Sequence, residues 1–269
     1  ICDAEGNEVA SACRPADETT VTVYVPDAKL WEIDAPYLYT VTAKLQRRNE
    51  TYDEISARVG VRSFSCDPNK GFIINGAETP LRGVSRHQDM LYKGNALTKE
   101  DHYEDARLIK ELGANTIRLA HYQHSQDFYD ACDEMGFVVW AEIPFISVMN
   151  QDPDAHQNCI SQLKELIIQN YHHASIVTWG ISNEITIKDK NRADMLDNHH
   201  MLNDLVHELD PSRPTTLACY AMCMPTHKVV HITDLVGYNL YLGWYVPFPW
   251  LNDLFLKGFH KIWPKRPLC

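Results

Sequence analysis

The chain has 269 residues, of which 45% are hydrophobic, and this is enough for one large domain or two unequal domains with a sizeable core. The formal net charge of −11 argues against nucleic acid or an anionic membrane as a partner, because phosphate groups are bound by basic surfaces. No window approaches the ~18 consecutive apolar residues of a membrane span. The eight cysteines show no metal-ligand spacing, so we expect most of them to be free thiols.

Residues 1–64 have the period of β-strands. Apolar side chains alternate along 20–25, 38–45 and 55–61, and prolines and a polar run at 47–50 supply the turns. Alternation of this kind predicts an antiparallel β-sandwich. A stretch of 64 residues holds too few strands to close a sandwich, so we expect only part of one here.

From residue 65 to 269 the pattern changes to strands that alternate with amphipathic helices. Strands are predicted at 80–87, 115–120, 137–142, 175–182, 215–219 and 235–239. Between them lie helices that Thr98 and Ser125 cap and that Gly113 and Gly136 end, followed by helices near 160–167, 195–209 and 255–263. This alternation indicates parallel βα units and the α/β class. A TIM barrel and a doubly wound sheet both fit, but no GxGxxG or phosphate-binding loop follows any strand, which disfavours the second.

Polar and aromatic side chains recur where five of these strands end. They are Arg86 to Asp89, Arg118 with His121 and Tyr122, Glu142, Asn183 with Glu184, and Asn239 with Tyr241 and Trp244. Each has an ordinary structural explanation alone, but in a barrel they would all converge on one rim. Hydroxyl groups need polar partners and the apolar face of a sugar needs an aromatic platform, so this set of side chains favours a carbohydrate site.

Several segments resemble glycoside hydrolase family 2, which includes β-galactosidases, β-glucuronidases and β-mannosidases. Similar to the barrel of that family are Gly71–Gly76, Leu81–Asp89, Asn115–Tyr122 and Val177–Glu184, while Leu30–Trp31 and Pro36–Tyr39 resemble the immunoglobulin-like domain that precedes the barrel. The resemblance covers nearly the whole chain. Among the members of the family, these segments are most similar to the smaller bacterial β-galactosidases. The resemblance therefore implies a β-galactoside oligosaccharide or glycan as the substrate.

The resemblance also implies a retaining mechanism and roles for particular residues. Glu184 matches the general acid/base, and Arg118 matches the arginine that keeps the nucleophile ionised. The positions that match sugar-binding or pocket-wall groups are His87, Asp89, His121, Asn183, Tyr241 and Trp244. A magnesium ligand of the large β-galactosidases is replaced by Pro144, so we predict no metal and no cofactor. The pairs His172–His173 and His199–His200 are predicted to lie on helix surfaces.

A retaining enzyme needs a second carboxylate ~5–5.5 Å from the first, and the family places it at the end of the seventh barrel strand. No Asp or Glu follows Asp253, and we expect that strand to begin where the chain reads Pro264 to Cys269 and ends. The chain is therefore predicted to be a fragment: part of an immunoglobulin-like β-sandwich, 1–64, followed by a C-terminally truncated (β/α)8 barrel, 65–269, without its last two βα units. Such a fragment is predicted to be inactive alone.

Three alternatives stay open beside the β-galactosidase. They are a non-catalytic carbohydrate-binding barrel that has lost its nucleophile, a β-glucuronidase or β-mannosidase of the same family, and another barrel hydrolase of the same clan. A glutamate codon shortly after Cys269 would favour the enzyme, whereas a stop codon would favour the binding protein. The longer enzyme could form a homo-oligomer, and a bacterial cytoplasm or periplasm is the expected compartment.

Overall fold

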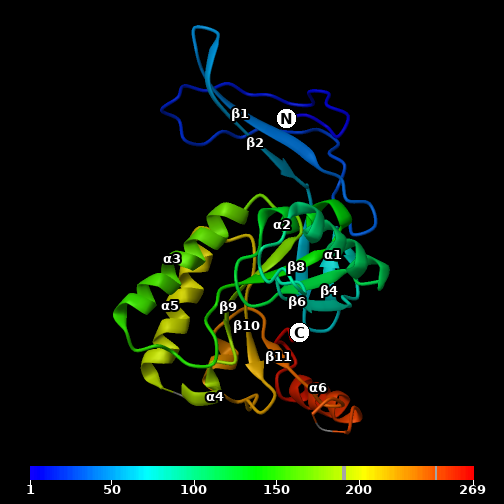
Figure 1. Cartoon of the computed structure of the whole chain (residues 1–269), viewed down its shortest axis with the longest axis vertical. Coiled ribbons are helices and arrows are strands. Elements are labelled where there is room, and N and C mark those ends of the chain that lie inside the picture. The colour runs from blue at the N-terminus through cyan, green and yellow to red at the C-terminus, as the bar shows by residue number, and fades with distance from the viewer. Residues whose placement is uncertain (190–191, 246) are drawn as a thin grey trace.

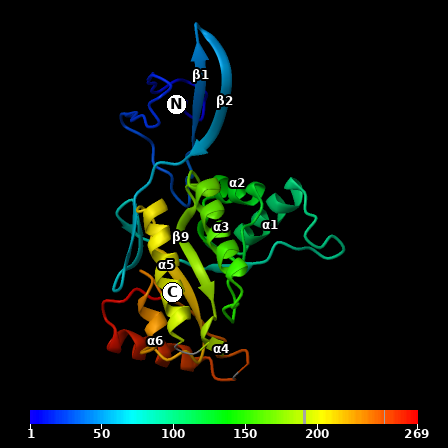
Figure 2. The ribbon, with the colours of Figure 1, turned by 90° about the vertical axis from the view of Figure 1, so that its left-hand side faces the viewer.

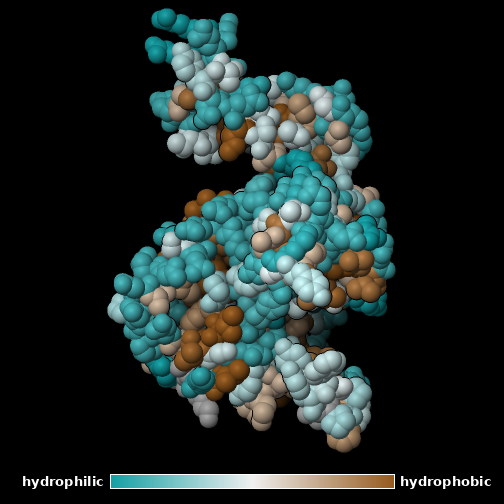
Figure 3. Space-filling model, viewed as in Figure 1, coloured by the Kyte–Doolittle hydropathy of each residue, from teal (hydrophilic) through white to brown (hydrophobic). Residues whose placement is uncertain are grey.

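The computed structural model describes residues 1–189, 192–245 and 247–269. Its N-terminal part contains a long antiparallel hairpin, β1 (Tyr39–Arg47) and β2 (Glu50–Val59), which projects away from the rest of the molecule (Figures 1 and 2). The tip of this hairpin is hydrophilic (Figure 3). The alternating patterns at 38–45 and 55–61 were therefore correct predictions of strands.

The predicted strand at 20–25 is wrong. Residues 20–25 carry no strand, and Val21 and Tyr24 are 48% and 81% exposed. A strand needs a neighbour for its backbone N–H and C=O groups, and the backbone of this segment pairs with no strand among the described residues.

A second sheet links the N-terminal part to the barrel. Three antiparallel strands form it: β3 (Phe64–Asp67), β4 (Gly71–Ile74) and β5 (Ala77–Glu78). It contributes to an apolar cluster that consists of Trp31, Ile33, Phe72, Ile74, Val138, Ala174 and Val177. The Trp31 Nε1–H also donates to the Asp133 carbonyl at 2.8 Å. This cluster, here called the amino-end cluster, lies where the strands of the barrel begin.

The barrel part is a sheet of six parallel strands in the order β11-β10-β9-β8-β7-β6. The strands are β6 (Gly83–Arg86), β7 (Thr116–Leu119), β8 (Val138–Glu142), β9 (Ile176–Asn183), β10 (Thr215–Tyr220) and β11 (Gly237–Asn239). All six coincide with strands that the sequence predicts. Leu268 pairs in parallel with Val236, and the Cys269 N–H donates to the Val236 carbonyl at 2.9 Å. The pairing beyond β11 thus begins at Leu268, within the segment where the seventh strand is expected to begin.

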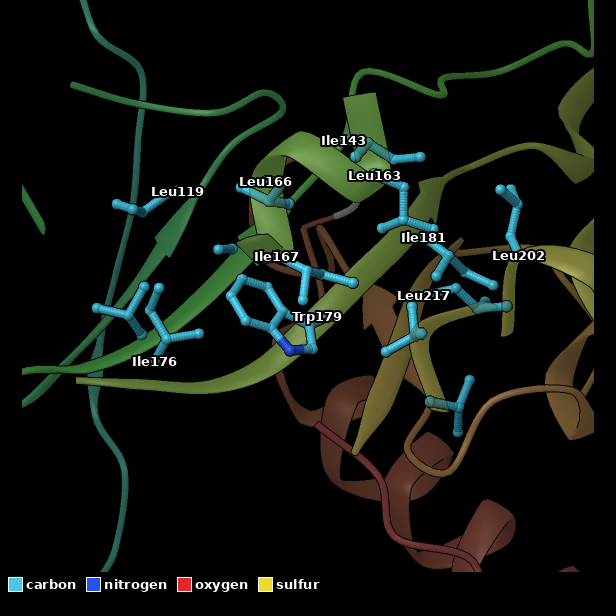
Figure 4. Close-up of a cluster of buried hydrophobic side chains, with 14 of the residues drawn as sticks. Leu119, Ile143, Leu163, Leu166, Ile167, Ile176, Trp179, Ile181, Leu202 and Leu217 are labelled. Carbon is cyan, nitrogen blue, oxygen red and sulfur yellow. The ribbon is translucent and has the colours of Figure 1, made fainter. Parts of the chain in front are cut away.

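Helices follow the strands, and several of them cover the outer face of this sheet. They are α1 (Lys99–Glu111), α2 (Gln126–Met135), α3 (Pro153–Asn170), α4 (Thr186–Asp189), α5 (Ala193–Leu209) and α6 (Trp250–Ile262), with a 3₁₀ turn at Lys228–His231. Trp179 and Ile181 of β9 pack there against Leu163, Leu166, Ile167 and Leu202 (Figure 4). The predicted capping box of Thr98 and Asp101 is present, and Gly136 ends α2 in the left-handed conformation that glycine tolerates best. None of the described helices is long and apolar enough to cross a membrane.

Candidate active site

The guanidinium group of Arg118 is the centre of a hydrogen-bond network at the carboxyl ends of the strands. Its Nε donates to Glu142 Oε2 at 3.0 Å, and its Nη2 donates to Glu142 Oε1 at 3.1 Å. Nη2 also donates to Asn183 Oδ1 at 2.7 Å, while Nη1 donates to Asn239 Oδ1 at 2.8 Å. The side chains of Arg118 and Glu142 are 12% and 1% exposed, so this bidentate ion pair lies largely out of water. One side chain of β7 thereby ties together β8, β9 and β11.

The carboxylate of Glu184 joins this network through Asn239. The Asn239 Nδ2 donates to Glu184 Oε1 at 2.8 Å and to Asn183 Oδ1 at 3.0 Å. Glu184 follows the last residue of β9 and has a left-handed backbone with φ 54°. Its N–H donates to the Ala218 carbonyl of β10 at 2.7 Å. The carboxylate is thus held at the rim by a side chain of β11 and a backbone group of β10.

Two histidines from β6 and β7 lie beside this network. His121 contacts Glu142 through Nδ1, and its ring centroid is 5.3 Å from that of His87. The residue after His87, Gln88, donates its N–H to the Tyr122 hydroxyl at 3.0 Å. Asp89 follows on the exposed loop after β6. The structure therefore brings His121 into contact with the network of Arg118 and His87 beside His121, whereas no hydrogen bond or ion pair among the described residues joins the exposed Asp89 to it. Their contacts with a sugar stay predictions.

The two aromatic residues predicted after β11 differ in position. Tyr241 is 47% exposed, and partial burial together with the carboxylate of Glu184 raises its pKa. The side chain of Trp244 is 82% exposed. The backbone N–H of Trp244 donates to the Tyr241 carbonyl within the same loop at 3.0 Å. The indole of Trp244 lies on the surface, and the roles of Tyr241 and Trp244 toward a sugar stay predictions.

A buried arginine supports the end of β6 from below the rim. Arg86 Nε donates to Asp105 Oδ2 at 2.8 Å, and its Nη1 and Nη2 donate to Nδ1 of His124 at 3.0 Å and of His102 at 3.2 Å. Because a guanidinium group only donates, both imidazoles accept and are neutral. Burial lowers the pKa of His124 to about 3. The Nε2–H of His124 then donates to the Ala120 carbonyl at 3.2 Å, next to His121.

Sequence reasoning assigned no role to Glu142 and Asn239, although it placed both at strand ends. The available signal was their position as the last residues of β8 and β11. The histidine prediction was wrong for three of the four residues, because His172 and His173 lie beyond the end of α3 at Asn170 and His199 is a buried residue of α5. His173 is buried against Asp133 Oδ2 at 2.7 Å, and His199 is buried against Ser182 Oγ at 2.8 Å, because each imidazole pairs with a buried polar group. Among the described residues, no group of three or more His, Cys, Asp and Glu could hold a metal ion.

The parallel sheet carries carboxylates, amides and histidines at its carboxyl rim, which is where TIM-barrel proteins place their sites. Residues 68–268 match the model of the Glycosyl hydrolases family 2, TIM barrel domain, and residues 3–62 match a second model of Glycosyl hydrolases family 2. The chain belongs to glycosyl hydrolases family 2. The family that the sequence resembles, with its barrel fold, is thereby confirmed.

Several relatives are similar over most of the chain. A beta-glucuronidase from Bacteroides fragilis is 37% identical over 88% of this chain, and a beta-galactosidase from Bacteroides ovatus is 30% identical over 88% of it. The crystal structure of an FMN-binding beta-glucuronidase from Facaelibacterium prausnitzii L2-6 is 59% identical over 99% of this chain, with a TM-score of 0.97. The chain spans 34%, 33% and 41% of the lengths of these three proteins.

Proposed function

We propose that this chain is the part of a retaining exo-β-glycosidase that carries the general acid/base, Glu184. The observation that supports this most is the carboxylate of Glu184 at the barrel rim, 2.8 Å from Asn239 Nδ2 and next to Asn183. In the first step Glu184 protonates the glycosidic oxygen as the bond to the leaving group breaks. In the second step it accepts a proton from the water that attacks the glycosyl-enzyme.

In this proposal the side-chain amide nitrogen of Asn183 is the group that contacts the substrate. Its Oδ1 accepts from both Arg118 and Asn239, so the Nδ2 hydrogens are the groups that can donate to the sugar. A donor beside the acid/base suits the sugar 2-hydroxyl, where hydrogen bonds strengthen as the oxocarbenium-like transition state forms. The network thus supplies both the orientation of Asn183 and the placement of Glu184.

Glu142 is a poor candidate for the nucleophile. Both of its oxygens are engaged, by Arg118 and by His121, and the side chain is 1% exposed. A nucleophile must instead present a free oxygen to the anomeric carbon. We therefore propose that the second carboxylate comes from a segment beyond these residues, and that Arg118 helps to keep it ionised once it is in place.

The preferred sugar in this proposal is β-glucuronate. Two of the relatives described above, at 59% and 37% identity, are named as beta-glucuronidases. The β-galactoside expected from the sequence is the second candidate, which the named beta-galactosidase at 30% identity supports. Hydrolysis of a glycoside transfers no electrons, so no step of the proposal is assigned to the FMN in the name of one relative.

The test uses the protein expressed from the whole reading frame that contains this chain. The values of kcat/KM are measured for p-nitrophenyl β-D-glucuronide, β-D-galactoside and β-D-mannoside. We expect the glucuronide to be the best substrate, and proton NMR to show the β-anomer as the first product. A preference for the galactoside overturns the sugar, and an α-anomer overturns the retaining mechanism. Tight binding of a sugar lactone without any turnover would favour the non-catalytic barrel.

A further inference from the structure

An indole ring fills part of the barrel interior directly beside the site. Trp140 lies at the middle of β8, in register with Arg118 of β7 and Thr178 of β9. The carbon Cζ of Arg118 is 4.4 Å from the centroid of the Trp140 ring, so the guanidinium group rests on the indole face. Trp140 therefore contacts the residue from which the whole network branches.

Two glycines leave the space that this ring occupies. A Cβ added at Gly237 of β11 would lie 2.6 Å from Cη2 and 3.1 Å from Cζ3 of Trp140. A Cβ added at Gly180 of β9 would overlap Trp140 Nε1 and lie 2.6 Å from Glu142 Cβ. Neither glycine has a positive φ, so the backbone conformation does not require glycine at either position. The ring reaches from β8 to β11, and these two positions accommodate it.

The indole is held by packing rather than by a hydrogen bond. Its Nε1 is buried and has no hydrogen-bond partner among the described residues. A buried donor without a partner is unfavourable for folding, and a phenylalanine or leucine would avoid it. The contact that a smaller apolar residue could not reproduce is the broad, electron-rich face beneath Arg118.

We propose that Trp140 is a positioning residue of the active site, which acts through Arg118. The Arg118 guanidinium donates to three different strands, and its plane must be fixed for all of these bonds to form together. The indole face sets that plane from inside the barrel. Through Arg118 it aligns Asn183 and Asn239, and Asn239 in turn holds Glu184. This inference rests on the proposed function, because it concerns the efficiency of that reaction.

The kinetic test compares Trp140→Leu, Trp140→Phe and Gly180→Ala with Trp31→Phe in the protein from the whole reading frame. Trp31 is a matched control, since it is also a buried tryptophan but lies in the amino-end cluster. We expect Trp140→Leu to lower kcat about 10- to 100-fold with KM within about threefold, because small misplacements of catalytic groups have effects of this size. Trp140→Phe should fall between it and wild type, whereas Gly180→Ala should lower kcat at least as far as Trp140→Leu, because its Cβ would displace the ring and Glu142.

Trp31→Phe should lower the thermal midpoint without lowering kcat. If the Trp140 variants lower kcat no more than Trp31→Phe does, the ring is merely structural and the inference is overturned. A shift confined to KM would overturn it as well, because the network would then act on binding alone.

A crystal structure of Trp140→Leu gives a readout that does not depend on turnover. We expect the Arg118 guanidinium to leave the plane in which it reaches both Glu142 and Asn239. An unmoved guanidinium overturns the inference. Absence of turnover in the wild-type protein would instead count against the proposed function, and the crystal structure would still decide the role of Trp140. If Trp140→Leu does not fold, Trp140→Phe is crystallised in its place.

Discussion

The two ends of the six-stranded sheet have opposite chemistry. At the carboxyl end, Arg118 joins Glu142, Asn183 and Asn239 in a network of charged and amide groups. At the amino end, the amino-end cluster is made of apolar side chains that join the N-terminal part to the barrel. Barrel enzymes place their reactions at the carboxyl end and depend on the opposite end for stability. Substitutions at the two ends should therefore change different measured quantities.

The largest expected effect is on activity, at the carboxyl end. In the longer protein, Glu184→Gln should lower kcat/KM by about 10²- to 10⁴-fold for aryl glycosides with poor leaving groups, because protonation then limits bond cleavage. Activated leaving groups should suffer less, and azide should restore the second step. The thermal midpoint should change little. An equal loss on all substrates, without rescue by azide, would remove Glu184 from the acid/base role.

At the amino end the expected effect is on stability. Trp31→Ala should lower the free energy of unfolding by about 3–5 kcal/mol, the usual cost of removing a fully buried large aromatic side chain. The substitution also leaves the Asp133 carbonyl without its donor. Chemical denaturation measures the change, with the exposed Trp250→Ala as the control. A large fall in kcat of the folded variant would contradict the division between the two ends.

A smaller effect, dependent on pH, is expected from His124 beneath the rim. The unfolded chain takes up a proton at this residue near pH 6.5, while the folded protein does not until its pKa of about 3. The folded pKa lies below the unfolded one, so stability is present above pH 6.5 and declines as the pH falls toward 3. The decline amounts to about 1.4 kcal/mol per pH unit.

His124→Gln tests this dependence, because a glutamine can accept from Arg86 and donate to the Ala120 carbonyl without titrating. Thermal melts between pH 4 and 7 should show a shallower decline for His124→Gln than for wild type. The exposed His260→Gln is the control. Parallel curves for wild type and His124→Gln would mean that His124 does not carry the acid sensitivity of the fold.

Periodicity predicted the barrel part well because its physical causes are local. Strands buried on both faces form continuous apolar runs, and caps such as Thr98 and Gly136 act within one helical turn. The same rule failed at 20–25, since alternation shows that a segment could be a strand but not that a partner strand exists. The short strands β3 to β5 were missed because two to four residues are too few for a periodic signal.

For the site, the sequence could place residues at the rim but could not pair them. The end of a strand is readable from the chain, and so Arg118, Asn183 and Glu184 were found. Their partnership with Asn239 depends on how far β7 and β9 lie from β11, which only the curled sheet determines. The lone indole of Trp140 gave no signal at all, because its importance comes from glycines on two other strands.

The backbone of Glu184 has a consequence for how this position can change over time. A glutamate with φ 54° costs roughly 1–2 kcal/mol relative to an unstrained residue, a cost that glycine avoids and asparagine reduces. Mutations that replace Glu184 with either residue would thus relieve this backbone cost, while they would remove the acceptor of the Asn239 hydrogen bond and the proposed acid/base. Drift without selection would favour such a replacement. The proposed chemistry of Glu184 at the rim therefore stands against the backbone preference of the folded chain at this position.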